Sequence, residues 1–167
     1  MNNPGLIFLL LLIVVQSRAQ SFGIGIAYAT SNAFNAEFEY LNNSNTYKFG
    51  FSFQNADTRG KLIDEQLPNH GKAVDGTGEY FSSLDLGYGK ILNDVITIDG
   101  EISIGSMNSY TNYIDNRFKG GGYHLITNKK TVAGVGINAG YIINKNWNVI
   151  VGYNTLRKLQ LGLRILL

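Results

Sequence analysis

Residues 22–54 read FGIGIAYATSNAFNAEFEYLNNSNTYKFGFSFQ, and this stretch decides the fold. Large apolar side chains alternate there with small or polar ones in three successive segments, and asparagine-rich turns at 31–32 and 42–45 separate the segments. A period of two is typical of β-strands with two different faces, and short asparagine turns join antiparallel neighbours. The apolar positions are Phe22, Ile24, Ile26, Tyr28, Phe34, Ala36, Phe38, Tyr40, Tyr47, Phe49, Phe51 and Phe53.

The same alternation returns further along the chain. It predicts strands at about 79–90 and 96–104, and others that begin near Ala133, Trp147 and Leu159. Each strand is close to the roughly 9–11 residues that a tilted strand needs to cross a bilayer. Two long polar segments, about 55–78 and 107–130, remain as connections. The count is therefore about eight strands, or ten if one long connection contains a hairpin of its own.

The second face of these strands indicates which side meets lipid. A soluble ligand-binding barrel, the alternative, would have a water-facing surface dense in lysine and glutamate. Here the second face is mostly glycine, alanine, serine, asparagine and threonine, and charged residues make up only 16% of the chain. Small residues suit the narrow interior of an eight-stranded barrel. We therefore predict an all-β fold, a closed up-and-down antiparallel transmembrane β-barrel with its apolar face outward.

The aromatic residues and the connections predict an orientation. An even number of strands places both chain ends on one side, which we expect to be periplasmic. Aromatic residues then form two girdles, because amphipathic rings settle at the two membrane interfaces. The turns at 42–45, 92–94 and 144–146 are short and fall on the periplasmic side, whereas both long connections fall outside.

The first residues are predicted to be a signal peptide. Residues 6–15 read LIFLLLLIVV, a run too short to span a bilayer as a helix. Ser17 and Ala19 supply the small residues expected before a cleavage site after Ala19. The predicted division is a signal peptide at 1–19 and an outer-membrane β-barrel domain at 20–167; the alternative for 1–19 is an uncleaved anchor helix.

The last strand carries the most specific motif. Gln160, Gly162, Ile165 and Leu167 form a polar residue, a glycine two positions on, and apolar residues three and five positions after it. This spacing resembles the C-terminal assembly signal of bacterial outer-membrane barrels, whose last residue is usually aromatic rather than leucine. The chain is thus similar to small OmpA/OmpX-like or porin-family barrels. The resemblance implies location in the bacterial outer membrane, contact with its lipid, and the barrel assembly machinery as a partner during biogenesis. It implies architecture rather than activity.

Charged residues on the predicted inner face form one candidate site. Because isolated buried charges are costly, we expect these side chains to pair in a network that fills and stiffens the lumen; the alternative is a conducting or proton-relaying path. Acids outnumber bases by five to two in this set: Glu37, Glu39, Lys48, Asp85, Asp99, Glu101 and Arg164.

Catalytic and cofactor chemistry finds little support. The two histidines, His70 and His124, lie in the long connections, and cysteine is absent. No Gly-x-Ser-x-Gly motif occurs, so we predict no catalytic, metal or cofactor site, and glycines 134, 136 and 140 are interpreted as small inward residues. A net charge of +2 does not indicate a nucleic-acid partner. The residues weighed as partners of a histidine base are Ser82, Ser83, Ser106, Ser109, Asp75 and Asp115.

The second long connection is basic. Arg117, Lys119, Lys129 and Lys130 face only one acid there, Asp115, and are possible contacts for the phosphates of outer-leaflet lipid. The preferred hypothesis is a non-enzymatic barrel of structural or surface-interaction type, with an unknown surface ligand. The alternatives are a narrow passive channel for small solutes, an outer-leaflet lipid-modifying enzyme and the soluble ligand-binding barrel.

Overall fold

The structure is a computed structural model that describes residues 20–67, 73–144 and 146–167. The predicted signal peptide at 1–19 and His70 lie outside the described residues. Among the residues that are described, no helix is long and apolar enough to cross a membrane. The described strands are β1 (Gln20–Ala29), β2 (Ala33–Asn42), β3 (Asn45–Gln54), β4 (Lys61–Leu62), β5 (Val74–Leu92), β6 (Ile96–Ile114), β7 (Gly122–Asn144), β8 (Trp147–Asn154) and β9 (Lys158–Leu166).

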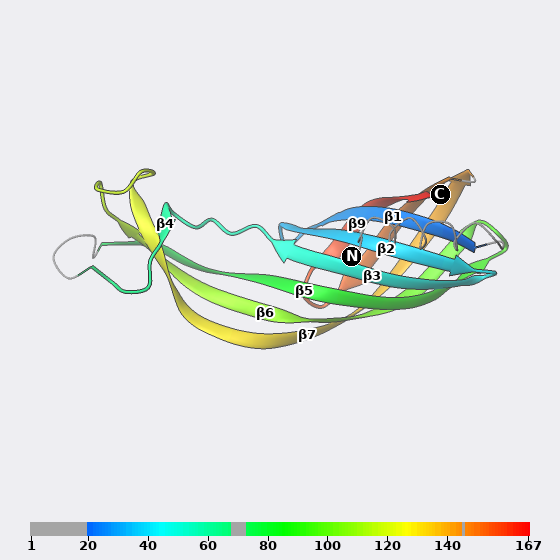
Figure 1. Ribbon diagram of the computed structural model, residues 1–167, viewed down its shortest axis with the longest axis horizontal. Helices are drawn as coiled ribbons and strands as arrows, with labels where there is room; N and C mark the ends of the chain where they lie inside the picture. The colour runs from blue at the N-terminus through cyan, green and yellow to red at the C-terminus, as the bar shows by residue number, and fades with distance from the viewer. Residues whose placement is uncertain (1–19, 68–72, 145) are drawn as a thin grey trace, which may run out of the picture.

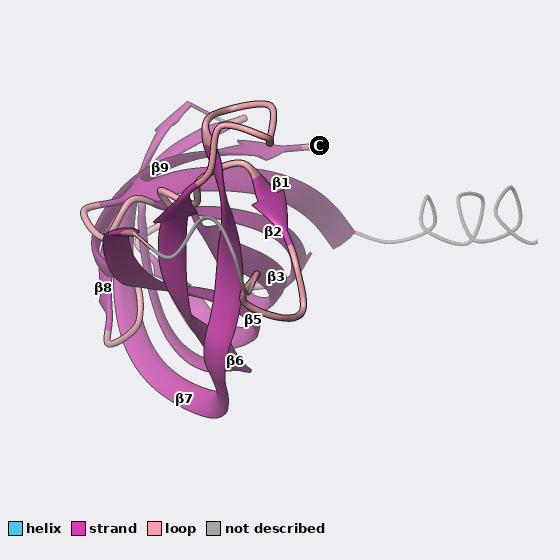
Figure 2. Cartoon of the chain, turned by 90° about the vertical axis from the view of Figure 1, so that its left-hand side faces the viewer, coloured by secondary structure: helices cyan, strands magenta, loops and turns pink. Residues whose placement is uncertain are grey.

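Eight of these strands close into a ring. Consecutive ring strands pair antiparallel, β8 pairs with both β7 and β9, and β9 returns to pair with β1 (Figures 1 and 2). The closing register sets Gly23 opposite Leu166 and Ala29 opposite Gln160. The predicted eight-stranded up-and-down barrel is therefore confirmed. The short β4 lies outside the ring and pairs in parallel with β7.

Burial follows the predicted alternation. Ile26 is 65% exposed and Phe38 63% exposed, whereas their chain neighbours Ala27 and Glu39 are buried. Aromatic rings meet near both ends of the barrel. Half-buried Phe22 and Tyr40 lie 5.4 Å apart at the end that carries Leu166, and exposed Tyr28 and Phe34 lie 4.9 Å apart at the other (ring centroids). We call these the terminal end and the projecting end. The outer surface is therefore an apolar belt between two aromatic rims, as lipid contact requires.

The prediction that residues 107–130 form a loop is wrong. β6 continues to Ile114 and β7 begins at Gly122, so only 115–121 form the connection. β5 likewise begins at Val74 rather than near Glu79. These parts of β5, β6 and β7 pair with one another beyond the last contacts of β3 and β8, and Figure 1 shows them projecting far from the barrel. We call residues 74–81, 105–114 and 122–134 the projecting sheet.

The projecting sheet continues past the barrel without the apolar alternation of the barrel strands. Its strands extend by about 8–13 residues, on the order of 30 Å at the usual rise of a strand. β7 adjusts to this course with a bulge opposite Ser109 and Tyr110. Apolar alternation does not predict such a strand, since the strand lacks an apolar face.

Residues 55–67, which follow β3, wrap around the projecting sheet and are called the strap. The Asn112 side chain accepts the backbone N–H of Arg59 at 2.9 Å and donates to the carbonyl of Asp57 at 2.8 Å. Ile63 then donates to the carbonyl of His124 along the edge of β7, at 3.1 Å. Asn112 and Tyr113 point to opposite faces because they are consecutive in a strand. Since Leu67 N–H lies 3.4 Å from the hydroxyl of Tyr123, the partner of Tyr113, the strap passes from one face to the other.

Candidate functional site

The barrel lumen contains two clusters of charged side chains. The first surrounds Arg164, which is completely buried. Its Nε donates to Glu37 Oε1 at 2.9 Å, and its Nη1 lies 2.9 Å from Glu39 Oε1. Lys48, on the facing strand β3, forms an ion pair with Asp99 and lies 4.0 Å from Glu39. This cluster joins β2, β3, β6 and β9 near the terminal end.

The second cluster surrounds Arg157, which the β8–β9 turn directs into the lumen. Its side chain is 1% exposed. Nη1 donates to Asp85 Oδ2 and to Ser52 Oγ, both at 2.7 Å, while Nη2 forms an ion pair with Glu101. Nε donates to Gln160 Oε1 at 2.8 Å. One arginine therefore ties β3, β5, β6 and β9 together across the barrel interior.

Amide side chains connect the two clusters. Asn138 donates to Asp99 Oδ1 at 2.8 Å and to Glu101 Oε2 at 3.3 Å, and its own oxygen accepts Gln160 Nε2 at 2.6 Å. Asn154 donates to Glu101 at 2.6 Å, and Asn35 donates to Asp85 at 3.1 Å. The lumen thus holds one continuous hydrogen-bonded network that reaches from β2 to β9 around the ring.

The structure places all seven inward charges of the sequence analysis inside the lumen, buried. It divides them into Glu37, Glu39, Lys48, Asp99 and Arg164 in one cluster, and Asp85 and Glu101 in the other.

Arg157 was missed because it lies in a turn, where alternation assigns no face. The imbalance of five acids against two bases was the available signal that a further base enters the lumen. With Arg157 the set has five acids and three bases.

An apolar layer lies beside the Arg157 cluster. Phe81, which begins the inward row of β5, is buried against Ala29 and Ala33, and Met107 and Leu156 pack on these residues. Leu156 directly precedes Arg157 in the same turn. The turn therefore places an apolar side chain in the layer and a charged side chain beneath it.

Glycines in the wall make room for the polar network. A Cβ on Gly136 would lie 2.6 Å from Glu101 Oε1, and a Cβ on Gly140 would lie 2.5 Å from Asn148 Oδ1. Both glycines face inward on β7, where Asn138 lies between them. Their role is close packing, so the glycines at 134, 136 and 140 belong to a strand and not to a nucleotide loop.

The residues of the C-terminal motif divide between the two faces of β9. Gln160 and Gly162 face the lumen, and Gln160 belongs to the Arg157 cluster. Ile165 and Leu167 face outward, and the N–H of Leu167 donates to the carbonyl of Phe22 at 2.6 Å. The motif thus lies at the seam where the last strand meets the first.

The residues weighed for catalysis do not gather around a histidine in the described part of the chain. His124 Nδ1 lies 2.9 Å from the carbonyl oxygen of Arg59. Ser109 donates to Glu79 at 2.9 Å, and Ser83 donates to Asp85 inside the lumen at 3.0 Å. Asp75 forms an ion pair with Arg59 at 2.5 Å.

Ser82 and Ser106 form a cross-strand pair where the projecting sheet begins. Within the described ranges, no group of three or more histidine, cysteine or acidic side chains could hold a metal ion.

The four basic residues of the second connection do not form one cluster. Arg117 donates hydrogen bonds to Asp115 at the tip of the β6–β7 hairpin, with 2.7 Å between Nη2 and Oδ2. These hydrogen bonds raise the pKa of Arg117. Lys119 lies in the same tip. Lys130 lies lower on β7, 3.7 Å from Glu79, and Lys129 beside it points to the opposite face of the sheet.

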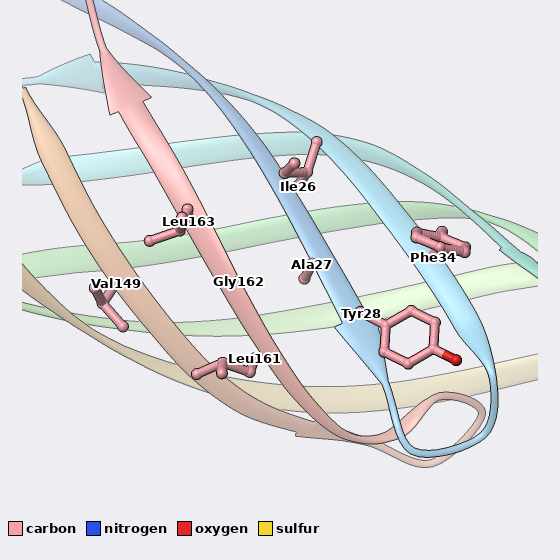
Figure 3. A pocket seen from close by; sticks show the side chains of 8 residues that line it. All are labelled: Ile26, Ala27, Tyr28, Phe34, Val149, Leu161, Gly162 and Leu163. Carbon is pink, nitrogen blue, oxygen red and sulfur yellow. The ribbon is translucent and has the colours of Figure 1, made fainter.

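A shallow groove of about 380 Å³ crosses the outer surface of β8, β9, β1 and β2 (Figure 3). Ile26, Tyr28 and Phe34 lie on one side of it and Leu161 and Leu163 on the other, and neither Ala27 nor Gly162 fills the space between. Its lining is apolar and belongs to the belt.

Comparison of the sequence with protein-family models and with curated proteins gives no match. Comparison with solved structures does. The chain is similar to Ail, the attachment invasion locus protein of Yersinia pestis, at 16% identity and a TM-score of 0.50, with 88% of this chain and 91% of that chain covered. It is also similar to a major outer membrane protein of Thermus thermophilus, at 12% identity and a TM-score of 0.51, with 90% and 100% covered. At these identities the likeness shows the fold: that of a small outer-membrane β-barrel.

Proposed function

We propose that this protein is a non-enzymatic barrel of the bacterial outer membrane that conducts no solute and holds the projecting sheet at the cell surface for contact with other molecules. Its chain ends then lie on the periplasmic side. The observation that carries the proposal is Arg157, which is buried in the lumen between Asp85 and Glu101. The outer-membrane location is supported by the apolar belt and by the fold of the similar structures.

The lumen network argues against a passive channel. A solute path past Arg157 requires its ion pairs to separate, and an uncompensated charge in a low-dielectric site costs several kcal/mol. The Arg164 cluster presents a second obstacle of the same kind, because Arg164 is wholly buried between Glu37 and Glu39. The apolar layer around Phe81 adds a third obstacle at the projecting end.

The projecting sheet has the features of a rigid presenting element. It is continuous with three barrel strands, so its base is anchored by the belt. At its tip, Tyr123 is fully buried and stacks on Tyr113 with ring centroids 5.1 Å apart. The strap adds hydrogen bonds to Asn112 and His124. A surface held in one conformation loses less entropy on binding than a mobile loop does, which favours interaction as its role.

Single-channel conductance in a planar bilayer tests the proposal. Refolded residues 20–167 should insert without stable ohmic openings. Arg157→Ala should introduce small openings, because water enters beside the unpaired Asp85 and Glu101. Lys158→Asn is the matched control: it removes the neighbouring charge outside the network at a position of positive φ (70°) that asparagine tolerates. The opposite result would be stable openings in the unaltered protein whose conductance changes in Glu101→Gln or Arg164→Ala. That result would contradict this proposal and support a passive channel.

A further inference from the structure

One edge of the projecting sheet is open. β8 pairs with β7 only up to Gly136, and β4 pairs with β7 only at Tyr123 and His124. Between these points no described strand lies alongside β7. The five consecutive residues 127–131 are all exposed. An unpaired strand edge presents free N–H and C=O groups and is a template for another strand.

The direction of these backbone groups follows from the β8–β9 turn. Val135 donates its N–H to Thr155 Oγ1 at 3.1 Å and accepts the N–H of Thr155 at 3.0 Å, so both its backbone groups point away from β6. In an antiparallel ladder this direction alternates from residue to residue. Ala133, Thr131 and Lys129 therefore direct their N–H and C=O groups to the open edge.

The chain itself shows that this edge accepts a strand. β4 adds to β7 in parallel, with Lys61 opposite Tyr123 and Leu62 opposite His124. The addition ends after the bond from Ile63 N–H to the carbonyl of His124. Beside the other edge, on β5, the strap leaves the end of β3 at Gln54 and runs to Asn112 on β6.

The charges along the open edge have one sign. Lys129 and Lys130 are exposed and point to opposite faces of β7. Glu79 lies 3.7 Å from Lys130, but both side chains are half exposed, and such pairs are weak and screened by salt. Lysines can also serve only to prevent pairing at an edge. An acidic strand, however, would meet a positive charge on each of its faces.

We propose that the edge of β7 from Lys129 to Ala133 binds an extended acidic polypeptide segment as an added β-strand. Main-chain hydrogen bonds to Ala133, Thr131 and Lys129 supply the binding, and the two lysines select acidic side chains. This inference rests on the proposed function, since it names the partner of the projecting sheet, but it is tested separately from the conductance.

The test uses a fluorescent peptide of alternating valine and glutamate with neutral blocked ends, titrated onto the full barrel in nanodiscs of zwitterionic lipid. Thr131→Pro removes one edge N–H and leaves the ladder to β6 intact, and it should weaken binding about tenfold or more. Thr131→Val keeps the N–H and should bind within about twofold. Lys129→Gln should weaken binding, whereas Lys119→Gln, at the hairpin tip, should not.

Amide hydrogen exchange supplies the second readout. Bound peptide should slow exchange at Lys129, Thr131 and Ala133 and leave Trp147, at the other end of the barrel, unchanged. The peptide could instead bind Thr131→Pro as it binds the unaltered protein and leave amide exchange along β7 unchanged. That result would mean a purely ionic contact and would overturn the proposal. Absence of peptide binding overturns it too. Binding of vesicles that contain anionic lipid through Lys129, without binding of the peptide, would likewise overturn the proposal and make the lysines lipid-phosphate contacts. None of these results changes whether the lumen conducts.

Discussion

Arg157 Nη1 donates to Asp85 Oδ2 at 2.7 Å, although 72 residues separate the two in the chain. The same guanidinium pairs with Glu101 on the next strand of the ring. Because Arg157 belongs to a turn and its partners belong to barrel strands, these ion pairs tie the β8–β9 turn to the lumen. The Arg157 cluster therefore depends on one side chain that enters the lumen from the end of the barrel, in addition to the Arg164 cluster that β9 contributes.

Replacement of Arg157 should strongly destabilise the barrel. Arg157→Ala leaves two buried carboxylates without their cation, and such a loss typically costs about 3–5 kcal/mol. Urea-induced unfolding in lipid vesicles, followed by the fluorescence of Trp147, measures the change. Lys158→Asn should change the free energy of unfolding by less than about 0.5 kcal/mol. Equal stabilities of Arg157→Ala and the unaltered protein would show that the cluster does not hold the turn.

The Arg164 and Glu37 side chains should show energetic coupling. Arg164→Met and Glu37→Gln each break the pair, and the double variant should lose less stability than the two single losses together, by about 0.5–3 kcal/mol. The same unfolding experiment provides all four values. A matched cycle on Lys130 and Glu79, which are half exposed and 3.7 Å apart, should give a coupling near the weak end of surface pairs. Additive losses at Arg164 and Glu37 would contradict a buried interaction.

The strap should lose part of its hydrogen bonding to β7 when a side chain is added where Gly60 approaches Gly122. Gly60 has φ of +52°, and a Cβ there would meet the carbonyl oxygen of Gly122. Gly60→Ala should therefore accelerate amide exchange at Ile63 without unfolding the barrel. Gly100→Ala is the control, because a Cβ at Gly100 has only the carbonyl oxygen of Gly136 nearby, at 3.9 Å. Unchanged exchange at Ile63 would mean that the strap does not depend on this close approach.

Trp147, the single tryptophan, should report the depth of the terminal-end rim. It is exposed on the outer face, where amphipathic rings prefer the membrane interface. Lipids brominated near the headgroup should quench its fluorescence more than lipids brominated near the chain ends. In the double variant Trp147→Phe with Val151→Trp, the order should reverse, since Val151 faces outward four residues further along β8, towards the middle of the belt. Equal quenching by the two lipids in both proteins would contradict the assignment of Trp147 to the membrane interface.

Alternation along the chain was sufficient to predict eight strands, their faces and the closed ring. It worked for β2 and β3 because each residue there meets either lipid or the lumen, so its polarity reports its face. It failed for 107–130, because the strands of the projecting sheet lack the apolar period. It also gave no face to Arg157, because a turn has no alternation to read.

The sequence by itself determined where each barrel strand lies and which side chains turn inward, since burial in lipid or in the lumen acts on each residue locally. Only the tertiary structure decided which inward charges pair, where the strap runs and which edge of the projecting sheet stays open. Those features depend on contacts between residues far apart in the chain, such as Arg157 with Asp85 and Ile63 with His124. Closure of the ring and its register bring these residues together, and no local pattern encodes that distance.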